Sequence, residues 1–378
     1  MGFRVCITLH RLIISVFFLP IASAFNPSYP AVFNFGDSNS DTGGYVASAV
    51  AFQLGPLFGE TYFHKASGRF CDGRVIIDFL MDAMGLPFLN PYLDSVGAPN
   101  FRKGCNFATG GASVLPPNVT KYPSFSFRVQ VSQFVRFKAR AINLLAEGKK
   151  VGKYLPPKHY FTRGLYMLDV GQNDLDSAFD SKSEDQVIAF IPTILSELEN
   201  GIQRLYNEGA RNFWIHNTGP LGCIPRIIAT FGKNASNLDQ LGCISSHNLA
   251  SRIFNTQLHD LCTKIKARFP DAIVTYVDIF SIKWNLISKF SQYGFKEPLA
   301  ACCGYGGPPL NFDTRIACGA TVNLNGTNVT ANACSNTSEY VNWDGNHYTE
   351  AANWHVAEEI LAGNYTDPPL STTGHIYK

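Results

Sequence analysis

The sequence predicts an α/β fold in which helices cover both faces of a parallel sheet. Short apolar segments alternate with longer helical ones along the chain, and this repetition of strand, helix and strand is typical of such sheets. The predicted strands are residues 30–36, 164–170, 212–217 and 272–279, and the predicted helices are 129–147, 185–208, 239–269, 281–292 and 349–362. Ligands of these sheets bind beyond the carboxyl ends of the strands, so we expect the functional residues there.

The individual elements follow from local patterns. The strand at 164–170 (GLYMLDV) is short and apolar, as is the strand at 212–217 (NFWIHN). The helix at 185–208 places one apolar face at steps of three and four residues: Val187, Phe190, Ile191, Ile194, Leu195, Leu198, Ile202 and Leu205. Residues 302–340 are rich in Gly, Asn and Cys, which predicts a disulfide-tied surface loop within one domain.

The beginning of the chain differs from the rest of its 378 residues. Arg4 and Arg11 precede a short apolar run, and Ala22-Ser23-Ala24 follows as a small-residue cleavage pattern. This predicts a secretory signal peptide at residues 1–24 and a single mature domain at 25–378. A membrane anchor is disfavoured, because the apolar run is far shorter than the roughly 20 residues that a span needs, and no later segment is long and apolar enough.

Charge and composition narrow the function classes. With 46% hydrophobic residues, the chain has ample material for a large core. Without Arg4 and Arg11, its 31 basic residues fall to 29, which equals the number of acidic residues. A net charge near zero gives no electrostatic case for binding nucleic acid or an anionic membrane. We expect a secreted, extracellular monomer, located in the cell wall or apoplast if it comes from a plant.

Sequons and cysteines agree with an extracellular protein. Six Asn-x-Ser/Thr sequons predict N-glycosylation at Asn118, Asn234, Asn325, Asn328, Asn336 and Asn364. Ten cysteines suit an oxidising compartment, and nine remain once Cys6 leaves with the signal peptide. Nine is odd, so at least one is free or pairs outside the chain, and the sequence does not fix the pairing. A zinc site is disfavoured, because the chain contains no CxxC pair and no HExxH.

Two motifs together could form a nucleophilic site. FGDSNSDTG (35–43) follows the first predicted strand; its residues are those of ordinary turns, but a serine on a sharp turn after a strand is also how many hydrolases expose a nucleophile. WDGNHYTE (343–350) places Asp344 three residues before His347, so that a carboxylate could orient an imidazole for Ser38. The alternative is that Asp344 caps the following helix and that His347 is an ordinary half-buried histidine.

Two further stretches could donate hydrogen bonds to an oxyanion. NFATGGA (106–112) has glycines after a predicted strand, where a backbone N–H can approach a ligand closely. GQND (171–174) places an amide side chain at the carboxyl end of the strand 164–170. Either stretch, taken alone, is also compatible with a plain turn.

In order along the chain, FGDSNSDTG, NFATGGA, GQND and WDGNH resemble the four sequence blocks of the SGNH hydrolase superfamily, and closely those of the plant-type GDSL esterase/lipase family. ASGRFCDGRVIID (66–78), GPLGCIP (219–225) and the cysteine pair within 300–304 resemble that family too, so the resemblance covers about residues 28–362. It implies a three-layer α/β/α, flavodoxin-like fold with a central parallel sheet.

The resemblance also implies the roles of individual residues. Ser38 would be the nucleophile, His347 the general base and then general acid, and Asp344 the residue that orients His347. The oxyanion hole would combine the backbone N–H groups of Ser38 and Gly110 with the side-chain amide of Asn173. The chain departs from the family's name motif at Asn39, where that motif has leucine, which leaves open the packing beside the nucleophile and the choice of substrate. Asp37 and Asp41 are expected to hold the loop by local hydrogen bonds.

The expected function is hydrolysis of a carboxylic ester through an acyl-enzyme, without a metal or organic cofactor. A lipid, an acylated carbohydrate or an acylated small metabolite would suit such a site. The alternatives are an acyltransferase that uses the same acyl-enzyme and an inactive carbohydrate-binding or defence glycoprotein. A glycosidase would need two carboxylates that flank a sugar bond, and no such pair is found beyond Asp344.

Several other polar residues are expected to be structural. Arg69, Asp72 and Arg74 lie in ASGRFCDGR, where we expect a salt-bridged loop packed near the site. We also expect a structural role for three histidines that lack an acidic neighbour at a useful spacing: His64, His216 and His247. Cys302 and Cys303 are expected to be half-cystines.

Overall fold

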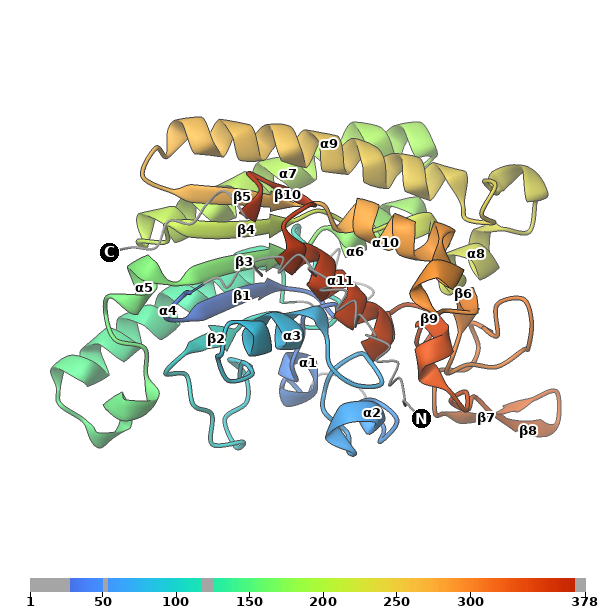
Figure 1. Cartoon of the computed structure of the whole chain (residues 1–378), viewed down its shortest axis with the longest axis horizontal. Helices are drawn as coiled ribbons and strands as arrows, with labels where there is room; N and C mark the ends of the chain where they lie inside the picture. The colour runs from blue at the N-terminus through green and yellow to red at the C-terminus, as the bar shows by residue number, and fades with distance from the viewer. Residues whose placement is uncertain (1–27, 50–53, 117–124, 371–378) are drawn as a thin grey trace, which may run out of the picture.

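The computed structural model describes residues 28–49, 54–116 and 125–370 (Figure 1). The predicted signal peptide lies outside the described residues. The main sheet has the order β10-β5-β4-β3-β1-β2. Its strands are β1 (Val32–Gly36), β2 (Gly104–Asn106), β3 (Leu165–Asp169), β4 (Asn212–His216), β5 (Ile273–Val277) and β10 (Thr366–Asp367).

All neighbouring strands of this sheet run parallel except β10, which pairs antiparallel with β5. From β1 the chain goes first to β2 on one side and then to β3 on the other side. The strand order therefore reverses at β1, and the carboxyl ends of β1 and β3 form the crevice in which doubly wound sheets bind their ligands.

Helices cover both faces of the sheet, which gives three layers (Figure 1). One face packs against α4 (Phe127–Ala146), α7 (Glu184–Asn207) and α9 (Ser245–Arg268), and the other packs against α3 (Ile76–Ala83), α10 (Ile279–Ser288) and α11 (Glu350–Ala362). Side chains alternate between the faces along each strand. In β1, Phe33 and Phe35 enter the core with α4, whereas Val32 enters the core with α3.

The remaining elements are short. The helices are α1 (Gly44–Ala47), α2 (Glu60–Phe63), α5 (Tyr160–Arg163), α6 (Gln172–Phe179) and α8 (Pro225–Phe231), and the strands outside the main sheet are β6 (Glu297–Ala301), β7 (Thr321–Leu324), β8 (Thr327–Thr330) and β9 (Tyr340–Asn342). The 3-10 turns are η1 (Lys150–Tyr154), η2 (Leu221–Cys223), η3 (Ala235–Asn237), η4 (Phe290–Tyr293) and η5 (Thr337–Glu339). β6 pairs with β9, and β7 with β8, so the region near the C-terminus forms two small sheets of its own.

The structure confirms the predicted α/β architecture, with one clear shift at a helix boundary. The helix expected from residue 239 begins at Ser245. The Asp239 carboxylate accepts hydrogen bonds from the N–H groups of Leu241 and Cys243 at 2.9 and 3.0 Å, which holds these residues in a turn. A disulfide between Cys243 and Cys223 ties the same turn to η2.

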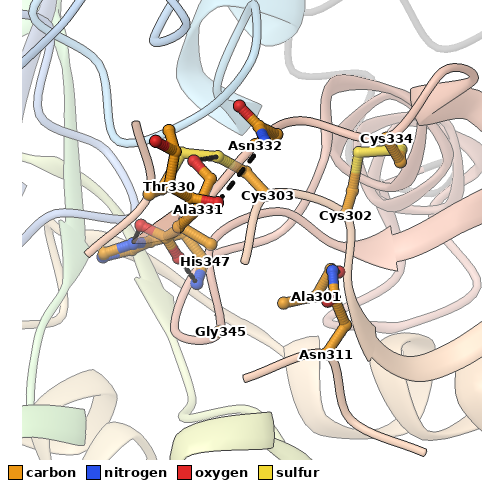
Figure 2. Close-up of a disulfide and its surroundings, with 12 residues drawn as sticks. Ala301, Cys302, Cys303, Asn311, Thr330, Ala331, Asn332, Cys334, Gly345 and His347 are labelled. Carbon is orange, nitrogen blue, oxygen red and sulfur yellow. Dashed lines mark hydrogen bonds and ion pairs between the residues drawn. A yellow bond between two sulfur atoms is a disulfide. The ribbon is translucent and has the colours of Figure 1, made fainter. Parts of the chain in front are cut away.

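Two further disulfides confirm the expected role of the cysteine pair. Cys302 is bonded to Cys334 (Figure 2), and Cys303 is bonded to Cys318, so two points of the loop are tied to the residues that directly follow β6. The free thiols among the described residues are buried: Cys71, Cys105 and Cys262.

Candidate active site

The turn after β1 presents Ser38 at the carboxyl edge of the sheet. Gly36 is required there, because a Cβ at this position would lie 2.6 Å from the carbonyl oxygen of Asp169 on β3. The Asp37 carboxylate accepts hydrogen bonds from the backbone and the side-chain N–H groups of Asn39, both at 2.9 Å. Asn39, which stands where the family motif has leucine, thus holds the carboxylate of the residue before Ser38.

Asp41 holds the next part of this loop. Its carboxylate accepts N–H hydrogen bonds from Gly43, Gly44 and Tyr45 at the start of α1, and a fourth from Gly110 at 2.7 Å. Burial raises the pKa of Asp41 to about 6 although these hydrogen bonds favour its charged form. The expectation that Asp37 and Asp41 hold the loop is confirmed, and Asp41 also fixes the NFATGGA stretch.

Ser38, His347 and Asp344 form a continuous hydrogen-bonded chain. His347 Nε2 lies 2.8 Å from Ser38 Oγ, and His347 Nδ1 lies 2.7 Å from Asp344 Oδ2. Burial opposes ionisation of Asp344, but the His347 ring and its hydrogen bonds lower the pKa of this carboxyl below its ordinary value. An ionised Asp344 favours the tautomer with the proton on Nδ1, which leaves Nε2 as an acceptor for the Ser38 hydroxyl.

The turn that carries Asp344 and His347 is compact. Asp344 Oδ1 accepts the N–H groups of Asn346 and His347, both at 2.9 Å. Gly345 has a φ of +92°, and a Cβ there would lie 2.1 Å from the ring of Phe312. Only glycine therefore fits at position 345, where the ring of the loop residue Phe312 packs against the turn.

The disulfide-tied loop forms hydrogen bonds with the backbone just before this turn. The N–H of Cys302 donates to the carbonyl of Asn342 at 3.0 Å, and the N–H of Cys303 donates to the carbonyl of Trp343 at 2.6 Å. Figure 2 shows both half-cystines in the same region as Gly345 and His347. The segment that directly precedes Asp344 is thus held by a backbone that two disulfides constrain.

One hydrogen bond bears on the expected oxyanion hole. The N–H of Gly110 donates to the Asp41 carboxylate at 2.7 Å. The next residue, Gly111, has a φ of +76°. Within the described part of the chain, no hydrogen-bond partner is recorded for the N–H of Gly111 or of Ser38.

Asn173 lies beside these donors, at the start of α6 and directly beyond β3. Its amide donates to the carbonyl of Ala112 at 2.8 Å and lies 3.4 Å from the Asp37 carboxylate. The first hydrogen bond fixes the side chain against the NFATGGA loop. The second contact is long, so the amide is only weakly engaged on that side.

Two supporting residues escaped the sequence analysis. Gln130 on α4 is fully buried and pairs with both backbone groups of Gly36, at 2.9 and 2.7 Å. Arg226 at the start of α8 donates its backbone N–H to the carbonyl of Gly345, and its side chain binds Asn346 and Asp176. Gln130 could have been noticed as a polar residue on the buried face of the predicted helix. No local sequence pattern distinguishes Arg226.

The residues set aside as structural behave as expected. Arg69 forms a buried two-point ion pair with Asp78 at 2.6 and 2.7 Å, and Arg74 binds Glu350 of α11 at 2.7 Å. His216 and His247 are buried, which lowers the pKa of both rings.

The other site expectations concern metals, membranes and glycans. Within residues 28–49, 54–116 and 125–370, no group of three His, Cys, Asp or Glu side chains is placed to hold a metal ion. In the same ranges, no helix has the length and apolar character needed to cross a membrane. Five predicted sequon residues lie on exposed positions: Asn234, Asn325, Asn328, Asn336 and Asn364. Asn118 lies outside the described residues.

Comparison with known proteins agrees with this geometry. Residues 32–360 match the family model described as GDSL-like lipase/acylhydrolase. Two Arabidopsis thaliana proteins named GDSL esterase/lipase are 55% and 50% identical, each over 93% of both chains. GDSL esterase/lipase ENOD8 of Medicago truncatula is 42% identical over 95% of this chain and 93% of its own. The chain therefore belongs to the GDSL-like lipase/acylhydrolase family.

Proposed function

We propose that this protein is a secreted, glycosylated serine esterase that hydrolyses carboxylic esters through an acyl-enzyme. The observation that carries the proposal is the unbroken chain of short contacts from Ser38 Oγ through the His347 ring to the Asp344 carboxylate. This arrangement activates a hydroxyl as a nucleophile. The names of the plant relatives, which are esterase/lipases, support the same reaction.

In the proposed mechanism, Ser38 Oγ attacks the ester carbonyl carbon while its proton passes to His347 Nε2. Asp344 stabilises the resulting imidazolium. The tetrahedral intermediate collapses, and the leaving alcohol takes the proton from His347. Water then attacks the acyl-enzyme with His347 as the base, which releases the carboxylic acid and restores Ser38.

The negative oxygen of the tetrahedral intermediate needs donors that are already in place. We assign this role to the N–H groups of Ser38 and Gly111 and to the amide of Asn173. Gly111 replaces Gly110 because Asp41 already accepts the Gly110 N–H. By this assignment, Asp41 contributes indirectly, since it fixes the peptide from which the Gly111 donor projects.

The proposal includes the expected fate and substrates of the chain. Residues 1–24 would be removed on secretion, residues 25–378 would form one domain, and the exposed sequons would carry N-glycans. The substrate would be a lipid, an acylated carbohydrate or an acylated small metabolite.

The central experiment compares wild-type protein with Ser38→Ala and with the control Ser132→Ala, which changes an exposed serine on α4. Hydrolysis of p-nitrophenyl esters from acetate to palmitate should fall by about 10⁴-fold or more in Ser38→Ala, because the nucleophile is lost, and should persist in the control. A fluorophosphonate should label the wild type and the control but not Ser38→Ala. Undiminished hydrolysis by purified Ser38→Ala would contradict the proposed function.

The oxyanion assignment predicts that Asn173→Ala lowers kcat by about 10²–10³-fold, because an amide donor to the transition state is removed. Asn200→Ala changes an asparagine in the last turns of α7 and serves as the control. Thermal unfolding of both variants separates lost catalysis from lost folding. An unchanged kcat in Asn173→Ala would remove this residue from the oxyanion hole.

A further inference from the structure

An aromatic side chain that the proposed mechanism does not use lies directly against the catalytic base. Phe70 belongs to the loop between α2 and α3 and is half-buried. Its ring centroid lies 5.0 Å from that of the His347 imidazole, with 40° between the two planes. A second ring, that of Tyr45 on α1, packs edge-on against Phe70 at 5.4 Å.

The same ring also contacts the loop that supplies the oxyanion donor. A Cβ at Gly110 would lie 2.5 and 2.6 Å from Cε2 and Cζ of Phe70. The absence of a side chain at Gly110 is therefore what lets the ring approach the backbone. Since Gly111 follows directly, Phe70 fills the space between the proposed oxyanion donor and the proposed base.

The backbone on both sides of Phe70 is firmly anchored. Arg69 is held by its buried ion pair with Asp78 of α3. On the other side, Asp72 accepts the N–H of Glu350 at 2.7 Å, at the start of α11. That helix begins three residues after His347, so the loop of Phe70 and the triad turn are tied to the same element.

We propose that Phe70 is a positioning residue of the active site, whose ring sets the spacing between His347 and the oxyanion loop and stabilises the imidazolium formed when Ser38 loses its proton. This inference rests on the proposed serine esterase function. The physical basis is the attraction between a cation and an aromatic ring whose centroid lies within about 6 Å. This attraction acts on the charged imidazole, which forms as Ser38 loses its proton. It therefore stabilises the transition state more than the resting enzyme.

Other charged groups also act on the His347 ring. Asp344 binds its Nδ1, and Asp37 of the nucleophile loop interacts with it electrostatically. Arg226 of α8 reaches the neighbouring Asn346 but is paired with Asp176 of α6. A change from Phe70 to leucine keeps all these charges, so a change in the pH profile reports the ring itself.

The test uses Phe70→Leu with Phe63→Leu as its matched control. Phe63 is also half-buried and lies under the guanidinium of Arg69, but no contact with the triad is recorded for it in the described residues. In Phe70→Leu we expect kcat to fall about 2- to 30-fold with little change in KM. The acid limb of the kcat/KM–pH profile should move about 0.4 to 1.5 units toward lower pH, because the protonated base loses its aromatic partner. Phe63→Leu should leave that limb in place.

A double-mutant cycle with Gly110→Ala tests the spacing role. Alanine at this position should displace the ring and lower kcat on its own. The same change should cost less in the Phe70→Leu background, where the smaller side chain leaves room for the added methyl group. Additive losses, or a Phe70→Leu profile identical to that of Phe63→Leu, would overturn the inference. Undiminished hydrolysis by Ser38→Ala would instead overturn the esterase mechanism on which it rests.

Discussion

At the scale of single residues, Asp37 has an unusual position for an acid. Its carboxyl is buried in the residue directly before Ser38, and burial, followed by the nearby Asp169 carboxylate, raises its pKa to about 7. Folding therefore makes the charged form of Asp37 less favourable than in the unfolded chain, where the pKa is 3.8. Between these two values the folded state binds more protons, so this group lowers stability as the pH rises from about 4 to 7.

Because ionisation of Asp37 lowers stability in this range, Asp37→Asn should reduce the pH dependence of the free energy of unfolding. Asparagine cannot ionise, so the loss of stability between about pH 4 and pH 7 should become smaller than in the wild type. The measurement is the urea unfolding midpoint at several pH values. Asp313→Asn is the control, because Arg315 lowers the pKa of Asp313 to about 2 and its titration lies outside this window. A slope in Asp37→Asn equal to that of the wild type would contradict the prediction.

Sequence reasoning was most successful for residues that lie in short, distinctive motifs. Ser38, Asp344 and His347 were named from short stretches, and the structure brings these three side chains together. Sequence reasoning named Gly110 as an oxyanion donor, and the local motif does not distinguish it from Gly111. What separates them is the carboxylate of Asp41, a long-range partner that no local pattern reveals.

At the scale of elements, the disulfide-tied loop and the turn that carries Asp344 and His347 are joined by backbone hydrogen bonds. The Cys303–Cys318 bond closes a loop with a sequence separation of 15, and the N–H of Cys303 supports the residue before Asp344. Loss of such a bond removes a constraint on the unfolded chain worth about 3 kcal/mol. It also frees the backbone that holds the turn in place.

We therefore predict that the double variant Cys303→Ala, Cys318→Ala loses about 3 kcal/mol of stability and also loses kcat at temperatures well below its unfolding transition. Both quantities are measured on the same preparation, by urea unfolding and by ester hydrolysis. Cys262→Ala is the control, since it removes a buried free thiol of α9 and breaks no disulfide. Full kcat in the double variant would show that the turn holds its geometry without this bond.

Long elements were predictable because burial imposes a period on the sequence. The apolar positions of α7 predicted its face and length, and its Ser183 cap fixes its first turn. β2 has only three residues and β10 has two, which is too short for any period to appear. Their pairing is decided by β1 and β5, which lie far away in the chain.

At the scale of the whole molecule, the two helical layers enclose different cores. The core on the α4 side is strongly aromatic. Five rings surround the ring of Phe134 on α4, with centroids 5.4–6.2 Å from its own: Phe33, Phe35, Phe107, Phe161 and Tyr166. Phe35 directly precedes Gly36, so this core lies under the strand that leads into the turn with Ser38.

This arrangement predicts that Phe134→Ala is among the costly core changes, because it removes a fully buried ring and leaves a space that five aromatic neighbours cannot close without moving. We expect a loss of about 3–5 kcal/mol in the free energy of unfolding. Val129→Ala, on the exposed side of the same helix, should change it by less than about 0.5 kcal/mol. Urea unfolding of the three proteins, followed by tryptophan fluorescence, measures both effects. A loss in Phe134→Ala as small as that in Val129→Ala would mean that the helical layer on α4 adds little to the stability of the sheet beneath Ser38.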